Sequence, residues 1–250
     1  MAGHSKWHNI KRRKESQDAK RAKIFTKLSK EIFAAVREGG TDPNTNLRLR
    51  MALTKAKAEN IPNDNIERTI KKAAGETGGV QYEEITYEGY GPGGAAVMVQ
   101  ALTDNKNRSA ADIRHAFTKH GGNLGENGCV SFLFDKKGQL IIDRTDEIDD
   151  EELMLEAIEA GAEEFDSDDE SFYIQTPPND FEDVKKQLES KNFQFSKAEV
   201  TMIPQTKAEL TDEHAEKMLK MIDALEDNDD VQSVYHNFEV DEKQLARLSY

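Results

Sequence analysis

The sequence predicts an α+β protein with an N-terminal three-helix domain and two further α+β domains, one inserted in the other. Apolar residues recur at helical spacing through the first 75 residues, and the spacing becomes that of strands after residues 75–79. Residues 138–205 then give the order β-α-β-β-α-β, which is typical of a ferredoxin-like unit. The predicted domains are residues 1–77, residues 78–137 together with 206–250, and the inserted residues 138–205.

The first predicted helix begins near Ser16 and Asp18, which can cap it, and ends at the glycine pair Gly39 and Gly40. Its apolar residues fall on one face, and lysines recur on the opposite face. The apolar face holds Phe25, Leu28, Ile32 and Val36. The helix is therefore expected to bury one side and present the other to solvent or to a partner.

Two shorter helices complete the first domain. Asp42 and Pro43 predict the cap and first position of the second helix, which ends near Asn60. The third helix follows Pro62 and ends at Gly75. Three amphipathic helices can bury one another's apolar faces, so a small bundle is expected.

The next segment predicts strands at residues 82–89 and 95–102, joined by the glycine-rich residues 89–94. A strand follows these glycines and no Lys-Ser/Thr pair does, so a hairpin turn is favoured over a phosphate-binding loop. Ser109 is predicted to cap a helix that runs to Lys119, and Cys129 to begin a strand that runs to Phe134. After the insertion, Thr211 is predicted to cap a further helix, and residues 231–240 are predicted to form the final strand.

Inside the insertion, the predicted strands are 139–142, 163–165, 172–175 and 195–202. The predicted helices are 150–160 and 181–188. Neither residues 78–137 nor residues 206–240 make a satisfactory domain alone, which is the reason for combining them around this unit.

Charge is divided unevenly along the chain. Residues 1–72 hold 18 basic and 8 acidic residues, whereas the remainder holds 16 basic and 40 acidic residues. The net charge of +10 on the first part and −24 on the rest is hidden in the total of −14. A cationic lobe attracts a polyanion and an anionic surface repels it, so nucleic acid is the predicted partner.

The strongest candidate site is the basic run from Lys11 to Lys14, where phosphates would relieve the repulsion between neighbouring cations. Trp7 could stack on a base or pin the arm to the protein, and the second role is favoured. A loop at residues 104–108 places two cations before a helix start, which is either an anion site or an ordinary connection. The predicted nucleic-acid-binding residues are Lys6, Lys11, Arg12, Arg13, Lys14, Lys20, Lys23, Lys27, Lys30, Lys106 and Arg108.

No catalytic or metal-binding residues and no cofactor are predicted, and the chain is not expected to be an enzyme. The single cysteine, Cys129, lies in an apolar pattern and is expected to fill a core. His4 and His8 have no further ligand nearby, and the acidic runs lack the spacing of a calcium loop. The sequence has no apolar run of membrane-spanning length and no secretory signal, so no membrane partner is expected. A single cysteine indicates the reducing cytoplasm, and the absence of a dimer seam indicates a monomer.

Several segments together resemble the YebC family, which includes a mitochondrial activator of cytochrome oxidase translation. They are residues 1–7 (MAGHSKW), Ile61-Pro62, residues 87–92 (YEGYGP), Asn107-Arg108, and residues 225–227 and 231–237. The resemblance implies a helical domain followed by two α+β domains, one inserted in the other. Beside these segments, residues 241–250 look like a variable tail. The resemblance supplies no set of catalytic residues.

The resemblance implies two functions. The first is a ribosome-associated translation factor that binds ribosomal RNA and relieves stalling at proline-rich sequences. The alternative is a DNA-binding transcriptional regulator, which would need an element that fits the major groove and usually dimer symmetry. The residues themselves leave a third possibility, a metal-dependent enzyme that acts on nucleic acid. Such an enzyme needs carboxylates near the basic part of the chain, whereas the carboxylates lie mainly outside it.

Overall fold

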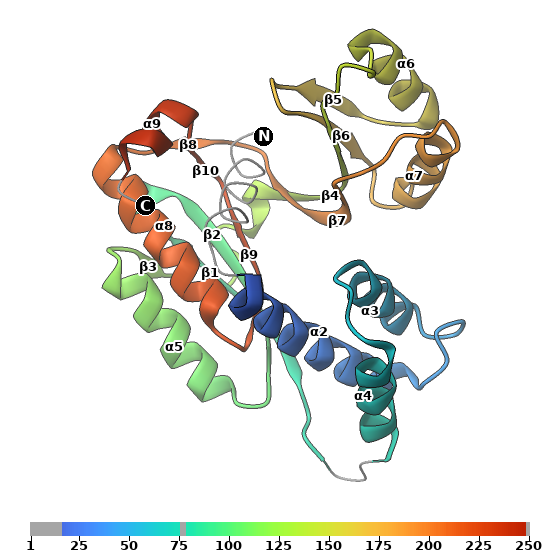
Figure 1. Ribbon diagram of the computed structural model, residues 1–250. Coiled ribbons are helices and arrows are strands. Elements are labelled where there is room, and N and C mark those ends of the chain that lie inside the picture. The colour runs from blue at the N-terminus through green and yellow to red at the C-terminus, as the bar shows by residue number, and fades with distance from the viewer. Residues whose placement is uncertain (1–16, 76–78, 249–250) are drawn as a thin grey trace.

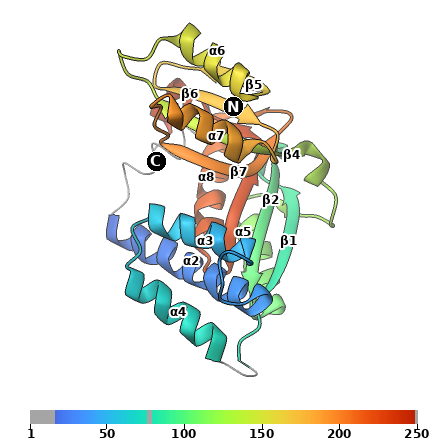
Figure 2. The same cartoon turned by 90° about the vertical axis from the view of Figure 1, so that its right-hand side faces the viewer.

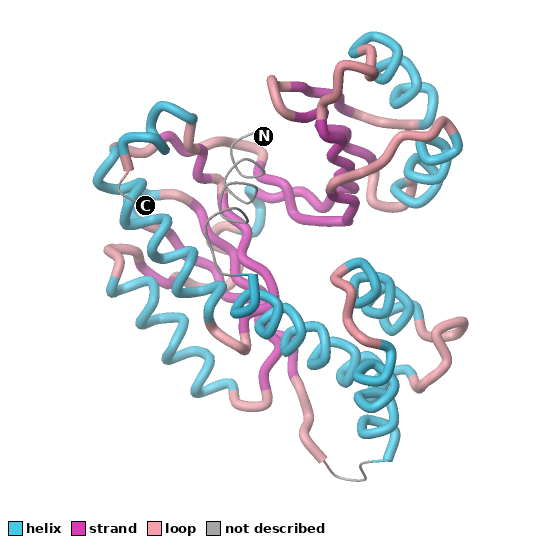
Figure 3. Tube along the Cα trace, in the orientation of Figure 1, coloured by secondary structure: helices cyan, strands magenta, loops and turns pink. Residues whose placement is uncertain are grey.

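The computed structural model describes residues 17–75 and 79–248, without the side chains of residues 17–20 and 242. Helices come first and antiparallel sheets follow (Figure 1; Figure 3), which confirms the predicted α+β fold class. Among the described helices, none has the length and apolar character needed to cross a bilayer.

The N-terminal helices are α2 (Gln17–Gly39), α3 (Leu47–Ala58) and α4 (Asn63–Gly75), called here the helical module. They enclose a core that includes Ile32, Val36, Leu49 and Ile66. The cap of α3 differs from the prediction, because Asn46 fills it rather than Asp42. The buried Asn46 side chain accepts from the Leu49 N–H and donates to the Ala35 and Gly40 carbonyls at 2.7 and 2.8 Å. Three satisfied bonds make it the better cap.

A first antiparallel sheet has the order β3-β1-β2-β9. Its strands are β1 (Glu83–Tyr90), β2 (Ala96–Thr103), β3 (Asn123–Leu124) and β9 (Val231–His236). The turn η1 (Pro92–Gly94) joins β1 to β2, as the predicted hairpin requires. Helices α5 (Lys106–Lys119) and α8 (Asp212–Asp227) lie side by side on one face (Figure 1) and bury a shared apolar core against β2 and β9.

The segment after β3 departs from the prediction, because Cys129 begins no strand. A short helical turn, η2 (Ser131–Leu133), precedes β4 (Phe134–Asp143) instead. The cause is the Glu88 carboxylate, which is 5% exposed and accepts from the backbone N–H groups of Gly128, Val130 and Ser131. A backbone that wraps around one carboxylate cannot also extend along a strand.

The predicted final strand is also interrupted. The Asn237 side chain accepts from the Ala96 N–H at 2.8 Å, and this separates β9 from β10 (Phe238–Glu239). Strand β10 pairs with β8 (Ala208–Glu209) in a separate two-stranded sheet. The predicted tail contains α9 (Glu242–Arg247), whose Arg247 forms an ion pair with Asp212 at 3.0 Å.

A second antiparallel sheet has the order β5-β6-β4-β7, the arrangement of a ferredoxin-like unit. Its other strands are β5 (Glu164–Ser167), β6 (Ser171–Thr176) and β7 (Lys197–Pro204). Helices α6 (Asp150–Ala160) and α7 (Phe181–Ser190) pack on it, with Leu140, Leu153, Ile174 and Leu188 in the core. Figure 2 shows the helical module beside the first sheet, away from α6.

Candidate nucleic-acid interface

Part of the predicted basic site falls outside the described residues. Lys6 and the run Lys11, Arg12, Arg13 and Lys14 precede Gln17, and Lys20 lies on α2 with a side chain that is not described. The geometry therefore concerns the remaining candidates, which are Lys23, Lys27, Lys30, Lys106 and Arg108.

The three described lysines of the α2 stripe bind groups of the protein itself, although the Lys23 side chain remains 37% exposed. Lys23 forms an ion pair with Asp227 and donates to its carbonyl oxygen at 3.1 Å. Lys27 donates to the Glu226 carbonyl at 2.6 Å, and Lys30 to the Asp229 carbonyl at 2.9 Å.

These carbonyls lie at the end of α8 and just beyond it. A helix C-terminus leaves carbonyl groups unpaired and carries partial negative charge, both of which favour a cation. The stripe therefore holds the helical module against α8.

Asp230, which follows the end of α8, is the centre of this contact. It is 3% exposed, and its carboxylate binds Lys30 Nζ at 2.9 Å, Arg108 Nη2 at 2.8 Å and Ser109 Oγ at 2.8 Å. Burial alone would raise the pKa of this carboxyl, but the hydrogen bonds from Arg108, Lys30 and Ser109 lower it to about 2. The charged Asp230 thus joins α2, α5 and the α8–β9 connection.

The loop at residues 104–108 connects β2 to α5. Asn105 caps α5 by accepting from the Arg108 N–H at 3.0 Å, so Ser109 is not the cap that the sequence predicted. Ser109 is fully buried and binds Asp230 instead. Lys106 pairs with Glu83, and Arg108 also pairs with Asp104 at 2.8 Å. Both predicted cations are therefore engaged by carboxylates of the same chain.

A different set of cations on the helical module points outward. Its members are exposed and form no ion pair among the residues that the structure describes: Arg21, Arg50, Lys55, Lys57, Arg68 and Lys71. These cations are not among the nucleic-acid-binding residues predicted from the sequence. A spacing signal existed, because Arg50 and Lys57 are seven positions apart and so share one flank of α3.

In the described part of the chain, no group of three or more His, Cys, Asp or Glu residues could hold a metal ion. Burial and the neighbouring Glu88 raise the pKa of the Cys129 thiol, which keeps it protonated and weakly nucleophilic.

Comparisons with known proteins cover nearly the whole chain. Residues 5–76 match a family model described as "TACO1/YebC protein N-terminal domain", and residues 82–238 match "TACO1/YebC second and third domain". Two relatives are each named a probable transcriptional regulatory protein. The one from Hathewaya histolytica is 59% identical over 97% of this chain and 98% of its own. The one from Geobacillus kaustophilus is 61% identical over 96% and 98%.

A solved structure is also similar. The crystal structure of a conserved hypothetical protein from Aquifex aeolicus has a TM-score of 0.79 and 49% sequence identity. The similarity covers 90% of this chain and 93% of that one.

Proposed function

Because the chain belongs to the TACO1/YebC family, we propose that it is a non-enzymatic regulator of gene expression, which binds nucleic acid in the cytoplasm as a monomer. One observation carries the proposal: the net charge of residues 1–72 is +10, and that of the remaining residues is −24. A polyanion would be attracted to the first part and kept away from the rest.

Contact with phosphate would come from two groups of cations. The basic run from Lys11 to Lys14 is one, and the outward cations of the helical module, such as Arg50 and Lys57, are the other. Neutralising phosphates releases counterions, which drives binding without reading sequence. The stripe lysines Lys23, Lys27 and Lys30 would act indirectly, by holding the helical module against α8.

Duplex DNA is the partner that the relatives' names support. Two proteins about 60% identical over nearly their full length are named as probable transcriptional regulators. In this form of the proposal, the chain would control transcription from promoters.

Ribosomal RNA is the second candidate, and the packing of α2 favours it. A protein that reads the major groove usually places one helix in it. The longest helix of the helical module, α2, packs against α3 and α4 on one side and meets the end of α8 with its lysines. It therefore cannot enter a groove without leaving α8.

In the ribosomal form, the factor would relieve stalling at proline-rich sequences. Proline restrains the backbone on which peptide transfer must occur. A protein that orders the reacting ends can accelerate that step through positioning, with no covalent chemistry of its own.

In-cell crosslinking, with sequencing of both the attached RNA and the attached DNA, tests the proposal. Promoter DNA enriched over bulk DNA would support the transcriptional form. Ribosomal RNA crosslinked near one defined site would support the translational form. Background levels of both nucleic acids would contradict the whole proposal.

Two variants make this experiment specific. The first variant has Gln in place of Lys11, Arg12, Arg13 and Lys14. The matched control has Gln in place of four lysines of the acidic residues 138–205, which are Lys185, Lys186, Lys191 and Lys197. Each variant loses four positive charges, so only the first should lose the crosslinked nucleic acid.

A further inference from the structure

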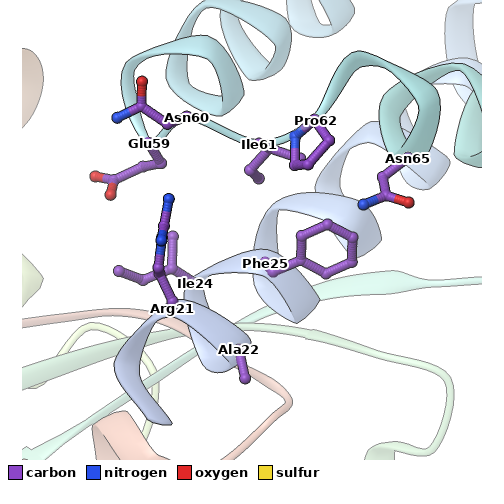
Figure 4. Close-up of a pocket in the computed structure, with 9 residues that line it drawn as sticks. All are labelled: Arg21, Ala22, Ile24, Phe25, Glu59, Asn60, Ile61, Pro62 and Asn65. Carbon is purple, nitrogen blue, oxygen red and sulfur yellow. The ribbon is translucent and has the colours of Figure 1, made fainter. Parts of the chain in front are cut away.

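The helical module contains a cavity of about 350 Å³ between the start of α2 and the turn that joins α3 to α4. Figure 4 shows the side chains around it, with those of α2 on one side and those of the turn on the other. They are Arg21, Ala22, Ile24, Phe25, Glu59, Asn60, Ile61, Pro62 and Asn65. The volume is at the lower end of the range for small-ligand sites.

The walls of this cavity are apolar and their backbone is fixed. Ile24 and the Phe25 ring face it from α2, and Ile61 and Pro62 face it from the turn. The Ile61 N–H donates to the Ala56 carbonyl at 2.9 Å, and the Asn65 N–H donates to the Pro62 carbonyl at 3.0 Å. Asn60 has a left-handed φ of 55°, a conformation that Asn adopts more readily than most residues. The cavity is thus preformed.

The rim carries polar groups with unused hydrogen-bonding capacity. The side chains of Arg21, Asn60 and Asn65 make no hydrogen bond or ion pair within residues 17–75 and 79–248. Figure 4 shows the Asn65 amide extending toward the Phe25 ring. Glu59 adds one carboxylate, which can accept from an amino or hydroxyl group. An amide offers both a donor and an acceptor, as the edge of a nucleobase does.

We propose that this cavity receives one unpaired nucleobase of a single-stranded nucleic acid. The base would stack against Phe25, and Asn60 and Asn65 would bind its edge. Arg21 would meet the adjoining phosphate. A base inside a duplex is paired and stacked on both faces, so only an unpaired base can enter. The inference rests on the proposed nucleic-acid binding and narrows its partner to a single strand.

The position of the cavity on the chain supports this occupant. It lies on the one strongly cationic part of the protein, and Arg21 is seven residues after Lys14, the last cation of the basic run. The exposed cation Arg21 at the rim favours a phosphate beside an inserted base.

The test uses the full chain and three variants. Phe25→Leu removes the ring and keeps an apolar side chain, and Asn65→Ala removes one edge contact without touching the core. Phe132→Leu is the matched control, because Phe132 is 65% exposed and lies far along the chain on η2. The probes are a fluorescent 12-nucleotide RNA, DNA of the same sequence, and the duplex of each. Thermal unfolding of every variant establishes that it folds.

Phe25→Leu should weaken binding of the single strands about 5- to 150-fold, which is the range for losing one stacked base. Asn65→Ala should weaken it less, and Phe132→Leu should have no effect. Duplex binding should stay unchanged, as should the slope of log affinity against log salt, because no phosphate contact is lost. The RNA and DNA arms distinguish which single strand is preferred.

A crosslink gives a direct second readout. RNA that carries 5-iodouridine is irradiated with the wild-type chain, and the protein is digested with trypsin. The adduct should appear on residues 24–27, the peptide that contains Phe25, and should be lost in Phe25→Leu.

The outcomes separate this inference from the proposed function. If the wild type binds no probe and no ribosomal RNA or promoter DNA, the proposed function fails. If it binds nucleic acid but a folded Phe25→Leu binds single strands as well as the wild type, the base pocket alone is overturned. An equal loss for single strands and duplexes would also overturn it, since that pattern indicates contact with the backbone.

Discussion

At the scale of single residues, Asp230 and Glu88 show how one carboxylate can organise several segments. Each is nearly inaccessible to solvent, and each binds groups that are distant in the sequence. Asp230 binds charged side chains from two helices, whereas Glu88 binds three backbone N–H groups of one loop. Buried charges are retained when both carboxylate oxygens accept hydrogen bonds, as they do at both sites.

Asp230→Asn should lower the free energy of unfolding by about 3 kcal/mol at pH 7, because Lys30 and Arg108 lose their shared charge. Chemical denaturation measures this change. Asp229→Asn, next to it and exposed, is the matched control and should cost little.

The low pKa of Asp230 predicts that the stability of the fold depends on pH. Its folded pKa of about 2 lies below the unfolded value of 3.8, so its stabilisation is complete above pH 4 and is lost as pH falls toward 2. The wild type should therefore lose about 2 kcal/mol more stability than Asp230→Asn between pH 5 and pH 2. Parallel curves for the two proteins would contradict the low pKa.

Glu88→Gln should loosen the loop around η2. Burial alone would raise the pKa of Glu88, but the three backbone N–H groups lower it, so the group is a carboxylate at neutral pH. Gln presents one acceptor and an unwanted donor to the same N–H groups, at a cost of about 1–3 kcal/mol. Hydrogen exchange at Gly128, Val130 and Ser131 should accelerate, while the exposed neighbour Glu126→Gln should leave it unchanged.

At the scale of elements, α2 has apolar contacts with α3 and α4 on one side and lysine contacts with the end of α8 on the other. The basic run and the stripe lysines should therefore respond differently to substitution. Replacing Lys11, Arg12, Arg13 and Lys14 with Gln should reduce the slope of log affinity against log salt by about 0.7–0.9 for each lost phosphate contact. Substituting Lys23, Lys27 and Lys30 should leave that slope unchanged and instead reduce stability. Binding titrations at several salt concentrations measure the slope, and chemical denaturation measures the stability. A flatter slope in the second variant would show that the stripe contacts phosphate.

Elements with local signals could be predicted from the sequence. Thr211 caps α8 as expected, by accepting from the His214 N–H, and the apolar spacing of α8 places Met218 and Ile222 in the core. The cap of α3 was predicted wrongly, because the advantage of Asn46 depends on carbonyls at Ala35 and Gly40 that only the folded chain brings near.

The candidate site was less predictable because its decisive contacts are distant in the sequence. Lysines opposite an apolar face are typical of a solvent-exposed surface, which is how the sequence was interpreted. Lys30 and Asp230 are 200 positions apart, so no spacing rule could pair them. The cavity at Phe25 has the same origin, since α2 forms one wall and the turn before α4 forms the other.

At the scale of the whole molecule, charge repulsion should limit stability. Residues 138–205 hold 20 acidic and 5 basic residues, so like charges crowd the second sheet. Raising salt from about 0.05 to 0.5 M shortens the Debye length several-fold and should raise the melting temperature by about 2–4 °C. Calorimetry measures this shift, and a decrease would mean that attraction between surface ion pairs outweighs the repulsion.

The pairing of β4 with β7 has a consequence for how the chain folds. Phe134, the first residue of β4, lies opposite Pro204, the last residue of β7. The chain therefore enters and leaves the second sheet at neighbouring positions. Strands β2 and β9 are neighbours in the first sheet, with Val97 opposite His236, but the whole second sheet lies between them in the sequence. If the second sheet forms first, the loop that they must close is about half as long, and its closure costs about 0.6 kcal/mol less entropy.

The second sheet should therefore fold early and the first sheet late, since non-local pairing is the slow step. In pulse-labelling hydrogen exchange during refolding, Leu140 and Ile174 should gain protection before Val99 and Val234 do. By folding first, the inserted segment would bring β2 and β9 of the first sheet close enough to pair.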